Sequence, residues 1–212
     1  MKITAISDLH GFLPKLDGGD LLIVAGDLTS RDTTIEHGKF FLWLENQNYK
    51  KIVYIAGNHD NFYQEKDRHF SSNKKLCYLQ DSGTEFEGVK IWGSPWTKWF
   101  HGINPRCKAF TKRSETELAK KWDLIPIDTE ILITHMPPYG ILDKIIDGDH
   151  VGSKSLQMEA FRLKNLKLWI FGHIHECYGE EPTGGNYSCR IINASIVNEY
   201  YDAVNKPVSV EL

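Results

Sequence analysis

The chain has 212 residues, of which 41% are hydrophobic and 25% charged, and its 25 Lys and Arg against 28 Asp and Glu give a net charge of −3. This composition is ordinary for a soluble globular protein, and we expect one domain over residues 1–212. A protein dedicated to long nucleic acid would show a basic excess, so such a partner is disfavoured. No apolar run approaches the length of a membrane span, so we expect no membrane partner.

The cysteine pattern bears on the compartment. The four cysteines, Cys77, Cys107, Cys177 and Cys189, include no Cys-x-x-Cys pair. The residues after Met1 show no basic segment followed by an apolar one, so no signal peptide is visible. We therefore predict reduced thiols, a cytoplasmic location and no thiolate zinc site.

Apolar runs, caps and breakers divide the chain into short elements. In the first third we predict strands over residues 2–7, 20–25 and 52–56, a helix capped by Thr33 or Thr34 that ends near residue 48, and a short helix or irregular loop over 62–70.

The remaining two thirds contain more strands than helices. We predict, in chain order, a strand over 76–79, a hairpin over 84–93, an aromatic loop over 94–102, a helix over 114–122, a strand over 130–134, a polar segment over 143–152, a helix over 155–165, and strands over 166–171, 187–192 and 208–212. Ser114 and Glu117 would form a capping box. Because helices separate only some of the strands, we predict an α/β (α+β) fold with two mixed sheets packed face to face and helices outside.

Five apolar runs each end in residues that bind metals well. Asp8 and His10 follow the first run, Asp27 the second, Asn58 with His59 and Asp60 the third, His135 the fourth, and His173 with His175 the last. Each motif alone is weak, since a Gly-Asp pair after a strand is more often a simple turn. Together they are difficult to explain by chance. Ligands in layered α/β folds bind at the carboxyl ends of strands, so these residues should converge on one site.

The candidate ligands combine two carboxylates, one amide oxygen and four imidazoles: Asp8, Asp27, Asn58, His10, His135, His173 and His175. Imidazole together with carboxylate suits Mn, Fe, Zn or Ni, and Mg is a further candidate. These ligands are too many for one catalytic ion, whereas two ions that share a bridging carboxylate would use them all. We predict two divalent metal ions, with Mn²⁺ favoured.

This motif set resembles the signature of the calcineurin-like metallophosphoesterases: Asp-x-His at Asp8, Gly-Asp at Asp27, Gly-Asn-His-Asp at 57–60, His135, and Gly-His-x-His at 172–175. The stretches KIVYIAGNHD, GSPWTKWF, ILITHMPP and GHIHECYG are similar to the small metallophosphoesterase-domain (MPPED-like) branch of that family. The resemblance covers residue 3 to about residue 194, and it implies a four-layer αββα sandwich that holds two metals.

The resemblance also implies a role for each motif residue. One ion would be held by Asp8, His10, Asp27 and His175, and the other by Asp27, Asn58, His135 and His173. His59 would be the catalytic acid–base residue, and Asp60 would orient it. A hydroxide bridging the two ions would attack phosphorus while His59 protonates the leaving alkoxide.

We predict a metal-dependent phosphodiesterase that acts on a nucleotide-like or other small diester. Phosphoprotein phosphatases of this superfamily have an Arg just after the Gly-Asn-His-Asp/Glu motif, whereas Asn61 and Phe62 follow it here. A diester depends less on such a clamp because it carries one negative charge. A phosphomonoesterase is the alternative within enzymes, and a non-catalytic binding scaffold on the same fold is the alternative outside them.

An aromatic segment offers a candidate substrate wall. The loop over Ser94–Gly102 contains Trp96, Trp99 and Phe100 at a spacing that fits neither a helix nor a strand. We predict that Trp96 or Trp99 faces the metals and stacks on the organic part of the substrate. The alternative is that two of these rings plug the edge of the sandwich. His101, and also His150, lie in loops that would approach the substrate.

Overall fold

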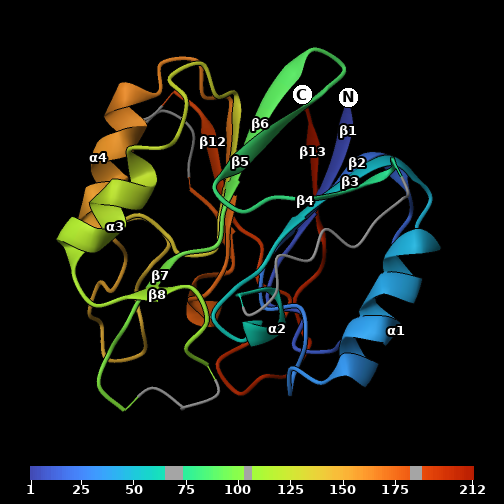
Figure 1. The fold of residues 1–212 in the computed structure, drawn as a ribbon, viewed down its shortest axis with the longest axis horizontal. Coiled ribbons are helices and arrows are strands. Elements are labelled where there is room, and N and C mark those ends of the chain that lie inside the picture. The colour runs from blue at the N-terminus through green and yellow to red at the C-terminus, as the bar shows by residue number, and fades with distance from the viewer. Residues whose placement is uncertain (65–73, 103–106, 182–187) are drawn as a thin grey trace.

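Two β-sheets lie face to face between helices. The computed structural model describes residues 1–64, 74–102, 107–181 and 188–212. In Figure 1, helix α1 (Thr34–Glu45) lies outside one sheet, and helices α3 (Glu115–Trp122) and α4 (Lys154–Arg162) lie outside the other. The layers therefore follow the order α, β, β, α, which confirms the predicted sandwich of two mixed sheets flanked by helices.

The first sheet has the strand order β13-β1-β2-β3-β4. Its strands are β1 (Lys2–Ile6), β2 (Gly19–Ala25), β3 (Tyr49–Ile55), β4 (Leu76–Tyr78) and β13 (Val208–Glu211). Strands β1 to β4 are parallel, and β13 runs antiparallel to β1. The carboxyl ends of β1, β2 and β3 therefore lie at the same edge of the sheet.

The second sheet has the order β11-β12-β10-β9-β6-β5. Its strands are β5 (Ser82–Phe86), β6 (Val89–Ser94), β9 (Ile131–Thr134), β10 (Leu168–Phe171), β11 (Gly179–Glu180) and β12 (Arg190–Asn193). The central strands β6, β9, β10 and β12 are parallel. Backbone hydrogen bonds from Ser7 to Ala194 and from Ile196 to Ser7 link the segments that follow β1 and β12. The carboxyl edges of the two sheets therefore meet.

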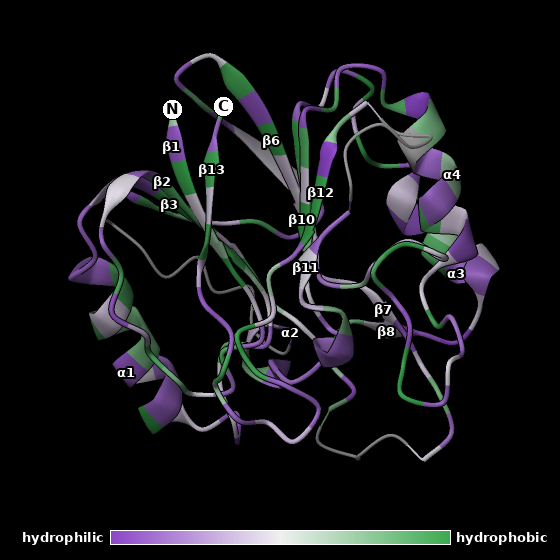
Figure 2. Ribbon diagram, turned by 180° about the vertical axis from the view of Figure 1, so that it is seen from behind, coloured by the Kyte–Doolittle hydropathy of each residue, from purple (hydrophilic) through white to green (hydrophobic). Residues whose placement is uncertain are grey.

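Both faces of the central strands are buried, which explains their continuous apolar runs. Ile23 and Val53 of the first sheet and Ile133 and Ile170 of the second belong to the core between the sheets. Leu22, the neighbour of Ile23, belongs instead to a second apolar cluster, which includes residues of the helices. In Figure 2, helices α1, α3 and α4 carry both hydrophilic and hydrophobic residues, as expected for elements with one face in water. No helix among the described residues is long and apolar enough to span a membrane.

The N-caps of α1 and α3 lie where the sequence predicts them, but the capping box predicted for α3 is incomplete. At α1, Thr33 Oγ1 accepts from the N–H of Glu36, and the Glu36 carboxylate accepts from the N–H of Thr33, which completes a capping box. At α3, Ser114 Oγ accepts from the N–H of Glu117 as predicted. The Glu117 carboxylate, however, accepts from the N–H of Arg113 rather than from that of Ser114, so the predicted box is incomplete.

Some element boundaries differ from those predicted. The predicted aromatic loop contains strand β7 (Thr97–Lys98), which pairs in parallel with β8 (Thr111–Lys112). A pairing of two residues leaves no periodic pattern in a sequence. Helix α2 (Asn61–Gln64) follows β3, and the rest of the predicted 62–70 segment lies outside the described residues. Helix α4 ends at Arg162 rather than at residue 165, and a short 3₁₀ helix (His175–Cys177) follows β10.

Candidate metal centre

The site lies where β1, β2 and β3 of the first sheet and β9 and β10 of the second sheet end. The loops that follow these strands turn sharply. Asp8, His10, Asp27 and His173 have φ angles of 52°, 41°, 52° and 70°. Non-glycine residues are uncommon in this left-handed region, and such strained residues cluster at functional sites. The strained turns follow β1, β2 and β10, and they bring the side chains of these loops to the site.

One group of donors consists of Asp8, His10, Asp27 and His175. His175 Nε2 lies 3.3 Å from Asp8 Oδ1 and 3.3 Å from His10 Nε2. His10 Nε2 lies 3.7 Å from Asp27 Oδ2. Donor atoms bound to one ion at about 2.1 Å lie roughly 3 to 3.5 Å apart. Donor atoms of Asp8, His10 and His175 lie within 4.8 Å of one another, which suits a single ion, and Asp27 adjoins this group through His10.

A second group consists of Asp27, Asn58 and His135, and the ring of His173 packs beside it. His135 Nε2 lies 3.3 Å from Asp27 Oδ1 and 3.2 Å from Asn58 Oδ1. The rings of His135 and His173 pack edge to face with their centroids 5.1 Å apart. Asp27 thus directs Oδ2 toward the first group and Oδ1 toward the second. A bridging carboxylate between two ions would be divided in the same way.

The hydrogen-bond pattern of these groups fits cations. His135 Nδ1 lies 2.8 Å from the carbonyl oxygen of Ala25, which can only accept, so Nδ1 carries the proton. Nε2 then faces the oxygens of Asn58 and Asp27. Oxygens that face this nitrogen require positive charge between them, which a proton on Nε2 supplies and a bound metal ion would replace. His175 is fixed similarly, because its Nδ1 lies 3.2 Å from the carbonyl oxygen of Asn198.

Burial and charge set the protonation of the ligands. Burial raises the pKa of the Asp27 carboxyl, but the neighbouring imidazoles, with His135 first, outweigh burial and hold this pKa well below its usual range. Burial lowers the pKa of His10 to about 4 and that of His173 to about 3. These are the protonation forms in which carboxylates and imidazoles bind metals. Burial also opposes a charge on His135, but Asp27 raises its pKa to about 9.

Two glycines leave the space that the carboxylates occupy. A Cβ atom at Gly57 would lie 2.2 Å from Asp27 Oδ1, and one at Gly172 would lie 1.9 Å from Asp8 Oδ2. Backbone N–H groups next to these glycines hold the same carboxylates. The N–H of His173 donates to Asp8 at 3.0 Å, and that of His59 donates to Asp27 at 3.0 Å. The Gly in each motif is therefore required by the close approach of a carboxylate.

The predicted orientation of His59 by Asp60 needs correction. The fully buried Asp60 carboxylate accepts from the N–H of Leu28 at 3.1 Å and from the N–H of Gly57 at 2.8 Å. It therefore ties together the loops that follow β2 and β3. The neighbour of His59 Nδ1 is instead the Sγ atom of Cys107, at 3.4 Å. Asp60 thus binds the backbone of the ligand-bearing loops, whereas Cys107 contacts the imidazole ring of His59.

Trp96 lies in the core rather than in the wall of the site, which corrects its predicted role in substrate binding. It is only 7% exposed, and its indole N–H donates to the Asp81 carboxylate at 2.8 Å. The ammonium groups of Lys112 and Lys121 each lie 4.2 Å from the centre of its ring. For Trp96 the alternative of a ring that packs within the sandwich is therefore the better description.

The other aromatic residues of this segment also differ from expectation. The rings of Trp99 and His101 pack on each other at 4.9 Å, and the guanidinium of Arg113 lies 5.0 Å from Trp99. Neither Trp99 nor His101 is among the residues that line the cavity next to the metal ligands. Lys98 and Phe100 supply the contribution of this segment to the cavity.

Tyr201 is a site residue that the sequence analysis missed. Its ring centre lies 4.7 Å from that of His10 and 5.1 Å from that of His175. It belongs to a turn in which the N–H of Tyr201 donates to the carbonyl oxygen of Asn198, the same oxygen that holds His175. Tyr201 follows the last motif in a segment without periodicity, and Cys107 also lies outside every motif. No sequence signal marks either residue.

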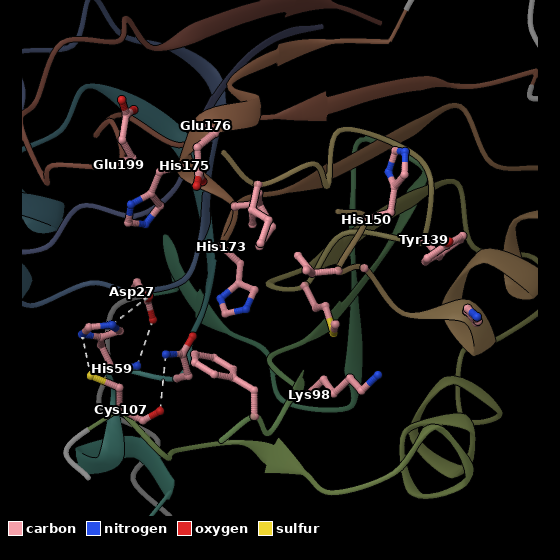
Figure 3. A pocket seen from close by; sticks show the side chains of 18 of the residues that line it. Asp27, His59, Lys98, Cys107, Tyr139, His150, His173, His175, Glu176 and Glu199 are labelled. Atoms are coloured by element: carbon pink, nitrogen blue, oxygen red, sulfur yellow. Dashed lines mark hydrogen bonds and ion pairs between the residues drawn. The ribbon is translucent and has the colours of Figure 1, made fainter. Parts of the chain in front are cut away.

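The donor groups open onto a cavity of about 780 Å³. Figure 3 shows Asp27, His59 and Cys107 at one side of it and Tyr139, His150 and Lys98 at the other. His150, which we expected in a loop near the substrate, lines the wall of this cavity. A volume of this size is typical of sites for organic ligands, which are much larger than a phosphate group.

Carboxylates and imidazoles that could hold metal ions therefore gather at the meeting carboxyl edges of the two sheets. The family model of the calcineurin-like phosphoesterases matches residues 1–177. The chain belongs to this family, whose reaction is the metal-dependent hydrolysis of phosphoesters.

The relatives point to one branch of the family. Metallophosphoesterase domain-containing protein 1 of Homo sapiens is 34% identical over the whole chain, which covers 71% of that protein. The UPF0046 protein T07D4.2 of Caenorhabditis elegans is 31% identical over the whole chain, which covers 60% of that protein. These similarities confirm the resemblance to the MPPED-like branch. The solved structure of TT1561 of Thermus thermophilus shares the fold, with a TM-score of 0.61 at 16% identity over 91% of this chain and 88% of that one.

Proposed function

We propose that this protein is a phosphodiesterase that uses two divalent ions, with Mn²⁺ favoured, to hydrolyse a small organic diester. The observation that carries the proposal is the division of the donors into two groups that share Asp27. When bound, two such ions supply an activated water and neutralise charge at the phosphate. Asp8, His10 and His175 would hold one ion together with Asp27, and Asn58, His135 and His173 would hold the other with it.

His59 is the residue placed to handle the proton of the leaving group. Its ring lines the cavity and packs edge to face on His10 with the ring centres 4.6 Å apart. Its Nδ1 is next to Cys107 Sγ, and its Nε2 lies 3.8 Å from Asp27 Oδ2. A proton on Nε2 would therefore lie at the metal end of the cavity, where it can pass to the departing alkoxide oxygen.

The charge of the cavity wall favours a diester over a monoester. Among the residues that the structure describes, no arginine lines the cavity, whose lysines are Lys98 and Lys154. Arg31 is exposed and uses its backbone N–H to contact Glu36. A monoester carries two negative charges and gains most from a bidentate guanidinium clamp. A diester carries one charge and depends less on that clamp.

The proposal is tested with two substrates that release the same leaving group. The Mn²⁺-loaded protein is assayed on bis-p-nitrophenyl phosphate and on p-nitrophenyl phosphate. We expect a higher kcat/KM on the diester, loss of the activity after chelation and recovery after addition of Mn²⁺. A higher kcat/KM on the monoester would point to a phosphomonoesterase, and a metal-loaded protein inactive on both would point to a binding scaffold.

A further inference from the structure

We propose that the end of the cavity remote from His59 binds a second anionic group of the substrate, such as an additional phosphate. This inference rests on the proposed function, because it describes the organic part of the same diester. We term this end, lined by Lys98, Tyr139, His150 and Lys154, the distal arm. Figure 3 shows Tyr139, His150 and Lys98 on the side of His173 away from Asp27 and His59.

His150 is held in place by a buried carboxylate. Asp143 is 0% exposed, and its Oδ2 accepts from the N–H of Gly140 at 3.0 Å and from the N–H of Gly152 at 2.8 Å. Its Oδ1 lies 2.5 Å from His150 Nδ1, so that nitrogen carries a proton. The contact fixes the ring and leaves only Nε2 for a ligand. The His150 side chain is 40% exposed at the cavity wall, where a ligand can reach it.

Lys154 adds a positive charge beside this ring. It is the first residue of α4, and its ammonium lies 4.9 Å from the centre of the Tyr139 ring. The rings of Tyr139 and His150 are themselves 5.6 Å apart. Because Lys154 and His150 both pack against Tyr139, this ring is poorly placed to stack on a nucleobase. The arm is better suited to an anion than to an aromatic group.

Lys98 lies beside Glu115, a carboxylate that also lines the cavity. Lys98 Nζ lies 3.9 Å from Glu115 Oε1. The other oxygen, Oε2, accepts from the hydroxyl of Ser153 at 2.9 Å and from the hydroxyl and N–H of Ser155 at 2.7 and 3.0 Å. The carboxylate of Glu115 is thus bound to the N-terminus of α4, and the ammonium group of Lys98 lies beside it. The acidic residues Glu176 and Glu199 line the cavity as well, near His175 in Figure 3.

Two chromogenic diesters test this subsite. One is thymidine 5′-(4-nitrophenyl phosphate), and the other is the same compound with an additional 3′-phosphate. Both release nitrophenolate from the same phosphodiester, so only the distal group differs. In the Mn²⁺-loaded protein we expect the 3′-phosphate to lower KM by about 10-fold or more, the scale of charge-assisted hydrogen bonds. Lys154→Gln and His150→Gln should each move the ratio of the two KM values toward one.

A matched control and a binding measurement complete the test. Lys120→Gln removes an exposed lysine of α3 that does not line the cavity, and it should keep the wild-type ratio. Calorimetry should show tighter binding of thymidine 3′,5′-bisphosphate than of thymidine 5′-phosphate, with the difference lost in Lys154→Gln. Equal KM values for the two diesters and equal affinities for the two nucleotides in the wild type would show that the distal arm binds no anion. That result would leave the proposed phosphodiesterase activity unaffected. If neither diester is hydrolysed, the proposed function fails and the subsite fails with it.

Discussion

The Sγ atom of Cys107 lies 3.4 Å from Nδ1 of His59, the residue that we propose as the proton donor. The carbonyl oxygen of Cys107 also accepts from the side-chain amide of Asn58, at 3.4 Å. One residue outside the motifs therefore contacts both the acid–base imidazole and a metal ligand. A carboxylate would bind an imidazole N–H strongly, whereas a thiol is a weak hydrogen-bonding group.

Cys107→Ala should lower kcat by about 2- to 10-fold on a dialkyl phosphate, the scale of one modest hydrogen bond. The effect should be smaller on a nitrophenyl ester, because nitrophenolate leaves without a proton. Steady-state kinetics on the two substrates measure the difference. Cys77→Ala, in strand β4 away from the site, is the matched control. An equal loss on both substrates would show that Cys107 supports the structure without positioning His59.

Tyr201→Ala should weaken Mn²⁺ binding by about 2- to 10-fold, because the ring packs on two imidazoles of the first donor group and such aromatic contacts are worth about 0.5–1.5 kcal/mol. Calorimetric titration of the metal-free protein measures this. The adjacent Tyr200 is 73% exposed, so Tyr200→Ala should bind Mn²⁺ like the wild type. The same Mn²⁺ affinity in both variants would show that Tyr201 does not support the metal ligands.

Gly172→Ala should remove metal from the first donor group. The new Cβ would lie 1.9 Å from Asp8 Oδ2 and 2.2 Å from Ser7 Oγ, so the carboxylate must move. Gly38→Ala is the control, because nothing lies within 4 Å of its added Cβ in helix α1. That control should raise the free energy of unfolding by about 0.5–1 kcal/mol. Elemental analysis and thermal melting follow both effects, and normal metal content in Gly172→Ala would contradict the close packing around Asp8.

Asp60→Ala should destabilise the fold as well as the site. It leaves the buried N–H groups of Leu28 and Gly57 without their acceptor, at a cost of about 1–3 kcal/mol for each. Asp60→Asn keeps an acceptor oxygen and should lose less. Denaturant unfolding compares the two variants. His59→Ala should keep both stability and metal, so a loss of stability in His59→Ala similar to that in Asp60→Ala would contradict the separate roles of these neighbours.

The sequence predicts the fold and the convergence of the donors for one physical reason. Parallel strands end at one edge, so residues such as Asp8, Asp27 and His135 that follow buried apolar runs must meet there. The two-layer arrangement follows from the excess of strands over helices. These inferences depend only on local patterns and on the direction of each strand.

The remaining features depend on contacts between distant segments. Trp96 is buried because Asp81 and Lys121 satisfy its indole and cover its ring, and no spacing within the Ser94–Gly102 segment reveals this. The contact of Cys107 with His59 joins two loops without periodicity. Tyr201 reaches the site through a turn that follows the last motif. Sequence patterns predict where strands lead but not which loop side chains meet beyond their ends.

The number of ions that each chain binds is the most direct test of the central claim. The metal-free protein is loaded with Mn²⁺, and the bound ions are counted by elemental analysis while hydrolysis of bis-p-nitrophenyl phosphate is followed on the same samples. We predict two ions per chain in the wild type, fewer in Asp27→Asn because Asp27 serves both donor groups, and no hydrolysis without metal. Full activity in protein shown to be free of metal would contradict the account.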